Sequence, residues 1–386
     1  MPQSIQLQKS GSRFTGSGLL LLVLWVIVQA ILLVRFGIRT DLEPAKYISE
    51  AKYFLETGSL SSPNFWLYST QIFLFTLAIK FNTGFVPVYI VQLLLNGIAT
   101  WQFYRFANYQ FNQRSAFLIT TLLILTIPIQ LFNCILQTES IFFSLTLIFS
   151  CYLLRQEKLR AKNWLALSAL MIIILFTRPT GLLFLPGFLL YLLWIFYRKN
   201  GFAITAAIFV SGFILFFLFL NMALGSGGEL NFINPFQTET IICGVPGIEG
   251  LADINVPDNP NSVQGLFYYV THNTAQFSRL AFEKTKSFFF LTRPYYSSSH
   301  NIFLVALIVP FYLFCIISLR WWWKNKRSTM CYCLVYIFIT WISVILSCDD
   351  WHNRFFLTIL PYLYILSLPL IDRIADRFMP AKRPVA

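Results

Sequence analysis

Charged side chains are scarce in this sequence. They make up 12 % of its 386 residues, whereas soluble proteins average about 25 %. So few charges could not cover the two or three soluble domains that this length would allow, which excludes a soluble enzyme and a disordered chain. Hydrophobic residues reach 57 %, with phenylalanine alone at 41 positions. This balance predicts an all-α polytopic membrane protein.

Several chemical motifs are also missing. The 3 histidines have no metal-ligand spacing, and there is no P-loop, dinucleotide glycine motif, nucleophile elbow or zinc-protease motif. The 7 cysteines are scattered, which excludes a secreted disulfide scaffold, and we expect Cys331 and Cys333 in their apolar run to be packing residues. The net charge of +13 fits cytoplasmic loops rich in lysine and arginine, so no nucleic-acid partner is expected.

About ten stretches are apolar enough to cross a bilayer, for which about 20 residues are needed. The predicted spans are about 18–36, 85–104, 116–134, 140–154, 164–177, 181–197, 202–222, 301–319, 330–347 and 355–371. Lys9 and Arg13 precede the first apolar run, and no small-x-small cleavage site follows it. We therefore predict an uncleaved signal anchor with a cytoplasmic N-terminus.

The basic residues predict the orientation of these spans. Lysines and arginines gather in short segments that should all face the cytoplasm: 105–114, 155–162, 198–199, 320–327 and 373–383. This holds only if the stretch 57–79 is a loop followed by a juxtamembrane or re-entrant helix, not a span. Both termini are then cytoplasmic, as expected of an integral, multi-pass protein of the bacterial plasma (inner) membrane.

This topology divides the chain into three regions. Residues 1–222 form an N-terminal transmembrane module with a first outer loop, 37–84. Residues 223–300 form a larger outer, extracytoplasmic loop rich in glycine and proline, in which an amphipathic helical pattern runs over 263–291. Residues 301–386 hold the last helices and a basic cytoplasmic tail.

Charged residues at the outer ends of the spans need an explanation, because a charge at mid-membrane costs about 2.5–3.5 kcal/mol. Four short segments hold the candidates: Asp41 and Glu43, Glu139, Arg178, and the last loop with Asp350, His352 and Arg354. The carboxylates could simply cap helices, and Arg178 could lie in a tight turn with its guanidinium at the interface. Their shared outer position favours a functional site in which arginine contacts phosphate.

The first of these segments should begin a helix. Proline is favoured in the first turn, so we expect a helix over 44–56 with an apolar stripe of Ile48, Ala51 and Leu55. Gly58 should end this helix.

Four stretches form a familiar set in their order along the chain. They are DLEPAKYISEAKYFLETG, LQTESIFFSLTLIFSCYLL, FTRPTGLLFLPGFLLYLL and HNRFFLTILPYLYIL. They resemble the outer loops and following helices of polyprenyl-phosphate-sugar-dependent glycosyltransferases of the GT-C superfamily. The members that they resemble are bacterial ones related to protein O-mannosyltransferases and the lipid A aminoarabinose transferase. It covers most of 18–200 and 348–371, and it implies a GT-C-like fold with outer juxtamembrane helices.

The resemblance implies an inverting sugar transfer. Asp41 would be the general base that takes the proton of the acceptor hydroxyl, helped by a pKa raised in a partly dry pocket. Glu43 and Glu139 would be further catalytic carboxylates, and Glu139 could position the acceptor or hold a divalent cation. The residues that bind the donor and stabilise charge on its leaving phosphate would be Arg178, Asp350, His352 and Arg354.

The expected partners are a polyprenyl-phosphate-linked sugar, a lipid, glycan or protein acceptor, and membrane lipids. No cofactor is required by the pattern, although a divalent cation is possible. A transporter or lipid flippase remains an alternative, favoured by short Pro/Gly-interrupted helices such as 164–187, and so does a surface-polysaccharide polymerase or ligase. The lack of mid-span charges and of paired halves favours the transferase over the transporter.

Overall fold

The computed structural model describes residues 16–156, 160–225 and 233–378. Within these ranges the chain is mostly helical, and its β contacts are isolated bridges. The predicted all-α class is therefore confirmed. Some of the basic residues used for the predicted orientation lie outside the described residues: Lys9, Arg13, Lys158, Lys382 and Arg383.

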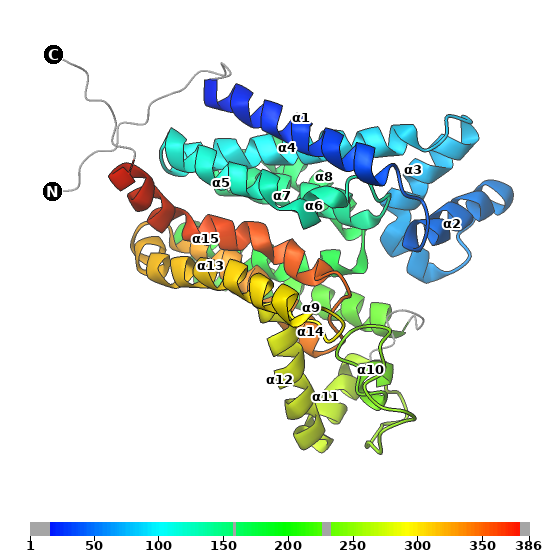
Figure 1. Ribbon diagram of the computed structural model, residues 1–386. Coiled ribbons are helices and arrows are strands. Elements are labelled where there is room, and N and C mark those ends of the chain that lie inside the picture. The colour runs from blue at the N-terminus through cyan, green and yellow to red at the C-terminus, as the bar shows by residue number, and fades with distance from the viewer. Residues whose placement is uncertain (1–15, 157–159, 226–232, 379–386) are drawn as a thin grey trace, which may run out of the picture.

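The helices follow one another along the chain, mostly with short connections, and the segment 238–262 has no helix (Figure 1). In the first half of the chain they are α1 (Gly16–Phe36), α2 (Glu43–Thr57), the 3-10 helix η1 (Pro63–Tyr68), α3 (Ser69–Lys80), α4 (Val86–Gln110), α5 (Gln113–Leu125), α6 (Ile127–Leu131), α7 (Thr138–Leu154) and α8 (Ala161–Leu175). In the second half they are the 3-10 helix η2 (Pro179–Leu183), α9 (Phe184–Gly225), α10 (Ile233–Gln237), α11 (Val263–His272), α12 (Thr274–Phe290), α13 (Ser298–Asn325), α14 (Arg327–Ile345) and α15 (Arg354–Phe378).

Helices α7 and α15 form the buried centre of the bundle. Nearly every residue of α7 and most residues of α15 are buried. The Ser150 hydroxyl on α7 lies 2.8 Å from the hydroxyls of Tyr332 on α14 and Tyr362 on α15. Hydrogen bonds of this kind are strong in apolar surroundings, so they tie the three helices together. The first turns of α7 and α15 lie at the same end of the molecule, where Arg354 pairs with Glu139 at 2.7 Å.

Among the described residues, five helices are long and apolar enough to cross a membrane: α1, α4, α13, α14 and α15. Further apolar helices of 10–17 residues lie at 113–125, 138–154 and 162–175, where shorter spans are predicted. The structure therefore supports a multi-pass membrane protein. The number of ten spans stays a prediction.

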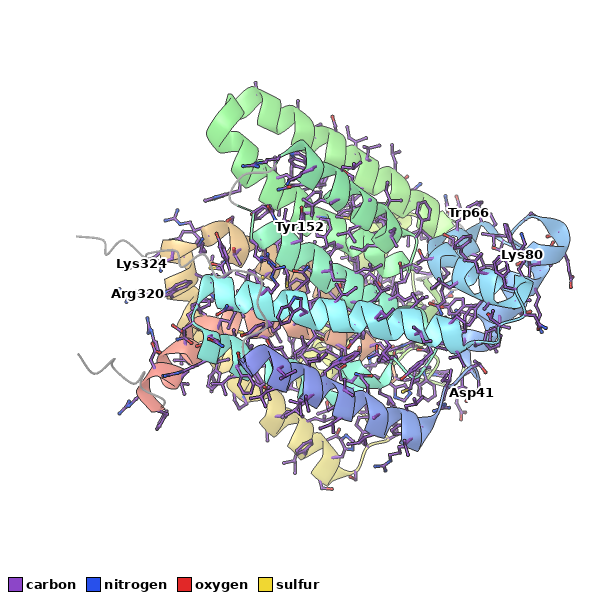
Figure 2. The ribbon with its side chains drawn as sticks, turned by 90° about the horizontal axis from the view of Figure 1, so that it is seen from above. Asp41, Trp66, Lys80, Tyr152, Arg320 and Lys324 are labelled. Carbon is purple, nitrogen blue, oxygen red and sulfur yellow. A yellow bond between two sulfur atoms is a disulfide. The ribbon has the colours of Figure 1, made fainter. Side chains whose placement is uncertain are left out.

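Helix α9 is continuous over 42 residues, whereas two spans were predicted there. A straight helix of this length would measure about 63 Å, twice the bilayer core of about 30 Å. The helix instead bends back on itself: a methyl group added at Gly212 would lie 3.1 Å from the Leu189 side chain, and Figure 2 shows the reversal in green. The two arms thus lie side by side, as expected for the predicted spans 181–197 and 202–222.

The bundle has two chemically different ends (Figure 2). Arg320 and Lys324 lie at one end, and Asp41 lies at the other with α2 and α3. The amide of Asn112 donates to Asp376 at 3.1 Å, which places the start of α5 beside the end of α15. The turns predicted to be cytoplasmic therefore gather at one end, and the predicted outer loops gather at the opposite end.

The apolar stretch 57–79 is not one long helix. It consists of η1 and most of α3, whose 12 residues rise about 18 Å, less than the bilayer core of about 30 Å. The preceding helix α2 has Pro44 in its first turn and ends at Gly58, which has a left-handed φ of 73°. The Gly58 N–H donates to the Phe54 carbonyl at 2.9 Å, so the expected helix and its glycine stop are confirmed.

The buried face of α2 differs from the predicted stripe. Tyr47, Glu50 and Ala51 are buried, whereas Leu55 is 38 % exposed. The Glu50 carboxylate accepts hydrogen bonds from the Ser61 N–H and hydroxyl, both at 2.6 Å. These bonds satisfy the buried carboxyl group of Glu50, and of the predicted stripe Ala51 is buried.

The segment 223–300, predicted to be an outer loop, has a small core of its own, made by Ile233, Phe236, Tyr269 and Leu280. The helical pattern predicted over 263–291 forms two helices, α11 and α12, which meet at Asn273. The Asn273 side chain hydrogen-bonds the backbone N–H and carbonyl of Asn255, at 2.9 and 3.0 Å. The Asn273 amide thus bonds the backbone of the loop at Asn255 at the point where the helical pattern is interrupted.

Candidate functional site

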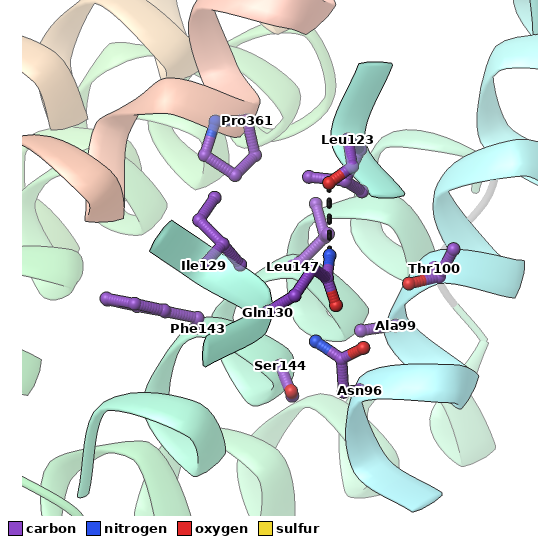
Figure 3. A pocket seen from close by; sticks show the side chains of 10 residues that line it. All are labelled: Asn96, Ala99, Thr100, Leu123, Ile129, Gln130, Phe143, Ser144, Leu147 and Pro361. Carbon is purple, nitrogen blue, oxygen red and sulfur yellow. Dashed lines mark hydrogen bonds between the residues drawn. The ribbon is translucent and has the colours of Figure 1, made fainter. Parts of the chain in front are cut away.

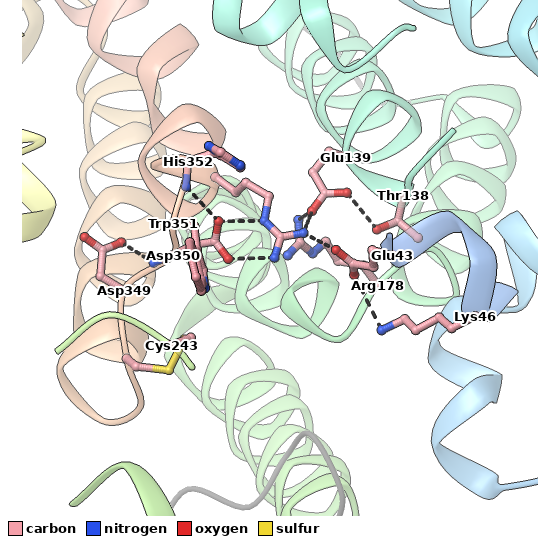
Figure 4. A network of polar contacts seen from close by, with 12 residues as sticks. Glu43, Lys46, Thr138, Glu139, Arg178, Cys243, Asp349, Asp350, Trp351 and His352 are labelled. Atoms are coloured by element: carbon pink, nitrogen blue, oxygen red, sulfur yellow. Dashed lines mark hydrogen bonds and ion pairs between the residues drawn. A yellow bond between two sulfur atoms is a disulfide. The ribbon is translucent and has the colours of Figure 1, made fainter. Parts of the chain in front are cut away.

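Five charged side chains from four separate segments meet at the outer-loop end of the bundle (Figure 4). We call them the outer ion network, after the side predicted for their loops: Glu43, Glu139, Arg178, Asp350 and Arg354. All five were predicted as site residues from the sequence.

Backbone pairing brings the first outer loop to the start of α7. The Arg39 N–H donates to the Cys134 carbonyl at 2.8 Å, and the Leu136 N–H donates to the Arg39 carbonyl at 3.0 Å. Glu43 is the first residue of α2, and Glu139 is the second residue of α7. The short bridge between the preceding segments therefore places the two carboxylates near each other.

Arg354 is the centre of the network. Its Nε and Nη2 donate to the two carboxylate oxygens of Asp350, at 2.7 and 2.6 Å, in the two-pronged geometry that suits a guanidinium. Its Nη1 donates to Glu139 at 2.7 Å and also to Glu43. One cation thus joins carboxylates from three segments that lie far apart in the sequence.

Arg178 supplies the second positive charge. Its Nη1 donates to Oε1 of Glu139 at 2.8 Å, and both side chains are almost fully buried. The rings of Phe142 and Phe355 lie within 6.0 Å of its guanidinium carbon, a distance at which cation–π attraction operates. Buried charges need partners of this kind, so Glu139 and Arg178 hold each other in the site.

The carboxylates of Glu43 and Asp350 are ionised at neutral pH. Burial raises the pKa of Glu43, but the charges of Arg354, Lys46 and Arg178 outweigh burial and bring this pKa to about 2. Burial also raises the pKa of Asp350, but the hydrogen bonds and charge of Arg354 outweigh it and lower the pKa below its ordinary value. Opposite charges thus decide the ionisation of both acids.

Asp41 lies outside the outer ion network. Its carboxylate accepts hydrogen bonds from Nη2 and Nε of Arg39, at 2.6 and 3.1 Å, and its side chain is 57 % exposed. The hydrogen bond from Arg39 lowers the pKa of Asp41. The expected raised pKa of Asp41 is therefore wrong for this conformation. The carboxylate lies in solvent beside the Arg39 guanidinium, not in a dry pocket.

His352 reaches the network through its backbone. Its N–H donates to Oδ1 of Asp350 at 3.2 Å, while the side chain is exposed. In Figure 4 the imidazole lies beside the network, not within it. The structure thus brings five of the seven predicted site residues together, and leaves Asp41 and the imidazole of His352 at the edge.

A second charged cluster, absent from the sequence prediction, lies directly behind Asp350. Arg293 is 1 % exposed, and its Nη2 lies 2.9 Å from Oδ2 of Asp349. The same guanidinium donates to the Asp350 carbonyl at 2.7 Å and to the Ser287 hydroxyl at 2.6 Å. We call Ser287, Arg293 and Asp349 the Arg293 clamp. It holds the backbone of the loop that carries Asp350.

A sequence signal for the clamp existed. Thr292-Arg293-Pro294 repeats the tripeptide Thr177-Arg178-Pro179, and each arginine lies between an apolar stretch and a proline. Only Thr177-Arg178-Pro179 is predicted from the sequence as part of the site. In the structure both arginines are buried and each pairs with a carboxylate, Arg178 with Glu139 and Arg293 with Asp349.

A disulfide between Cys243 and Cys348 was also not predicted. Beside it the Cys243 N–H donates to the Asp349 carbonyl at 2.7 Å, and the Asp349 N–H donates to the Ile241 carbonyl at 2.8 Å. The covalent bond and this short pairing join the outer segment 223–300 to the loop of the outer ion network. Cys331 and Cys333 are free and at least partly buried, which confirms the packing role expected of them.

Two cavities lie away from the network. The first, of about 10 Å³, lies mainly between α4, α6 and α7, and its polar lining includes Asn96, Gln130 and Ser144 (Figure 3). It has room for one water molecule. The second, of about 580 Å³, lies at the opposite end of the bundle, beside Asn112 and Asp376.

A divalent cation does not fit the network in this arrangement. Among the residues that the structure describes, no group of three or more His, Cys, Asp or Glu side chains is placed to hold a metal ion. The carboxylates of Glu43, Glu139 and Asp350 face guanidinium groups instead, and positive neighbours disfavour a cation.

The outer ion network is a partly exposed cluster of ionised carboxylates and guanidiniums at one end of an apolar helical bundle. Such a cluster can recognise an anionic headgroup and can accept or donate protons beside it. No protein-family model matches the chain, and no curated protein sequence matches it at a significant level.

Proposed function

We propose that this chain is a membrane glycosyltransferase of the GT-C type. It would move a hexose or pentose from a polyprenyl-phosphate donor to a lipid, glycan or protein acceptor at the outer face of the membrane, with inversion at the sugar carbon. The observation that supports this proposal is the outer ion network, in which two guanidiniums lie where apolar helices end. A lipid-linked phosphate needs both a cationic site and an apolar path for its tail.

The proposed reaction is a single displacement. A base takes the proton of the acceptor hydroxyl, the oxygen attacks C1 of the sugar, and polyprenyl phosphate leaves with the bonding electron pair. Arg354 would stabilise the charge on the leaving phosphate. Arg178 and Asp350 would hold Arg354 and Glu139 in place, and the exposed imidazole of His352 would contact the donor from the edge of the site.

Asp41 remains the proposed general base, with Glu43 and Glu139 as further carboxylates of the site. In the structure Asp41 is paired with Arg39, which makes its carboxylate a weaker base. The proposal therefore requires that Asp41 leave Arg39 when the acceptor binds. Both side chains are partly exposed, 57 % for Asp41 and 39 % for Arg39, and solvent screens exposed pairs of this kind so that they contribute little.

The proposed topology has about ten spans, cytoplasmic termini and the outer ion network outside the bacterial plasma membrane. The Cys243–Cys348 disulfide supports this orientation, because disulfides persist in oxidising compartments and are rare in the cytosol. The basic end of the bundle, with Arg320 and Lys324, would then lie inside.

The test is sugar transfer in membranes that contain the full chain. Membranes are supplied with a panel of radiolabelled polyprenyl-phosphate sugars, and label in acceptor material is measured for the wild type and for Asp41→Asn. We expect transfer by the wild type and a loss of at least about 100-fold in the variant. Near-wild-type transfer by a well-expressed Asp41→Asn protein would remove Asp41 from the base role. If label crosses the membrane of sealed vesicles and none is transferred to an acceptor, the protein is a transporter and the proposed transferase activity is wrong.

A further inference from the structure

The Glu43 carboxylate is surrounded by groups that suit a phosphate. One oxygen accepts from Nη1 of Arg354. The other accepts from the Tyr47 hydroxyl at 2.9 Å and lies 3.5 Å from Nζ of Lys46. A guanidinium, an ammonium and a phenol thus converge on one anion, which is the donor set expected of a phosphate site.

This arrangement is open to exchange. The side chains of Glu43, Arg354 and Lys46 are 24 %, 19 % and 28 % exposed, so solvent and ligands can reach them. Arg354 has its Nε and Nη2 committed to Asp350. Its Nη1, which Glu43 shares with Glu139, is therefore the part of the guanidinium where a ligand anion can replace a carboxylate.

The backbone before Glu43 is strained in this position. Leu42 has φ 62° and ψ −123°, a conformation that bulky L-residues rarely adopt, and its side chain is 78 % exposed. The exposed Leu42 side chain therefore does not explain the strain, and the next residue, Glu43, is the one held by three donor groups. Strain of this kind at a functional site is typical of a segment that has a second conformation.

We propose that Glu43 is an internal occupant of a phosphate subsite formed by Arg354, Lys46 and Tyr47, and that the phosphate of the lipid-linked donor displaces it. Displacement replaces one anion by another on the same three donors and relaxes the backbone at Leu42. Lys46 and Tyr47 are then phosphate-binding residues that the sequence did not point to. This inference rests on the proposed function, because it takes polyprenyl phosphate as the ligand.

The test measures binding of farnesyl phosphate, a short polyprenyl phosphate, to the purified full chain in nanodiscs. Glu43→Gln removes the competing charge and keeps the shape of the side chain, so we expect about tenfold tighter binding. Lys46→Gln removes a phosphate partner, so we expect about tenfold weaker binding. Glu56→Gln and Lys52→Gln are matched controls, because they make the same charge changes at exposed positions of the same helix and should change binding less than twofold.

Unchanged or weaker binding of farnesyl phosphate by Glu43→Gln would overturn the inference. Equal tightening in Glu56→Gln would also overturn it, because the effect would then come from net charge. Farnesol, which lacks the phosphate, should bind the wild type and Glu43→Gln equally, and a parallel gain for farnesol would place the effect on the lipid tail. Inorganic phosphate tests the headgroup alone, and it should show the same order of variants at lower affinity.

Lys46→Gln keeps the inference falsifiable if Glu43→Gln fails to fold, since unchanged farnesyl phosphate binding by a folded Lys46→Gln would contradict the subsite. The outcome also separates the two proposals. If the wild type binds farnesyl phosphate but the variants do not follow the expected order, Glu43 is not an internal occupant, and the proposed transferase activity is unaffected. Absence of binding by every folded protein removes both.

Discussion

The outer ion network and the Arg293 clamp lie on opposite sides of Asp350 and differ in how completely their charges are paired. In the clamp, Arg293 and Asp349 have fully buried side chains, and all three guanidinium nitrogens of Arg293 donate within the chain. In the network, Arg354 and Glu43 keep 19 % and 24 % of their side-chain surface exposed. The clamp is closed to ligands, whereas the network is accessible.

This difference indicates that the Arg293 clamp has a structural role and that the outer ion network has a ligand-binding role. A buried charge with every donor paired cannot change partner without exposing another charge to an apolar interior, which is costly. A partly exposed pair can exchange its carboxylate for a ligand anion, because water stabilises the displaced group. We infer that the clamp fixes the Asp350 loop and that the network is the part that meets substrate.

The largest expected effect is that of Arg354→Ala on transfer. The substitution removes the one cation shared by Glu43, Glu139 and Asp350, so transfer should fall at least about 100-fold. Labelled sugar transfer in membranes measures it. Arg373→Ala, at an exposed position of the same helix, should retain transfer. Normal transfer by Arg354→Ala would mean that the network does not meet substrate.

Arg293→Met should mainly reduce stability. Removing one partner of a buried pair leaves Asp349 unpaired and costs about 3–5 kcal/mol, which thermal unfolding in detergent would detect. Arg279→Met is the matched control, because Arg279 is 58 % exposed and pairs with Glu239, a kind of pair worth about 0–1 kcal/mol. Equal melting temperatures for the two variants would show that the clamp does not hold the loop.

The disulfide should contribute to the stability of the same loop. Replacing Cys243 and Cys348 by serine removes a cross-link with a sequence separation of 105, and we expect a loss of about 2–4 kcal/mol. A reducing agent should lower the melting temperature of the wild type but not that of the double variant. An identical response of both proteins to the reducing agent would contradict this.

The smallest expected effect is a pH dependence from Lys284. This side chain is buried on α12 and donates to the Ile345 carbonyl at 3.3 Å, and burial lowers its pKa from 10.5 to about 7. Between these two values the unfolded chain binds more protons than the folded chain, so stability should rise with pH by at most about 1.4 kcal/mol per unit. It should level off below pH 7, where Lys284 is protonated in both states.

Melting temperatures measured from pH 6 to pH 9 would show this slope. Lys284→Met should remove it, because the substituted side chain does not titrate, while Lys286→Met is a control at an exposed position of the same helix. A slope that persists in Lys284→Met would assign the pH dependence to another group.

Patterns with a local physical cause were predictable from the sequence. The lack of charge fixed the helical membrane class, because a spanning segment must satisfy its own backbone hydrogen bonds. Pro44 and Gly58 marked the ends of α2 through their own backbone preferences. Charges placed where apolar runs end pointed to Glu43, Glu139, Arg178, Asp350 and Arg354.

Pairings between distant segments were not predictable in this way. Asp41 and Glu43 are equivalent in the sequence, yet only Glu43 meets Arg354, since the backbone turn at Leu42 directs the two side chains differently. No pattern in the sequence pairs Cys243 with Cys348 among the 7 cysteines. The partner of Cys348 depended on how the outer segment packs.

By itself, the sequence determined the helical class of this protein, the positions of its apolar segments and which charged residues lie at their ends, because each of these depends on neighbours along the chain. Only the tertiary structure decided which charges became partners, that Arg293 is buried behind the site, and that Asp41 stands apart from it. The free energy of a buried charge depends on what surrounds it in space, and those surroundings come from segments hundreds of residues apart.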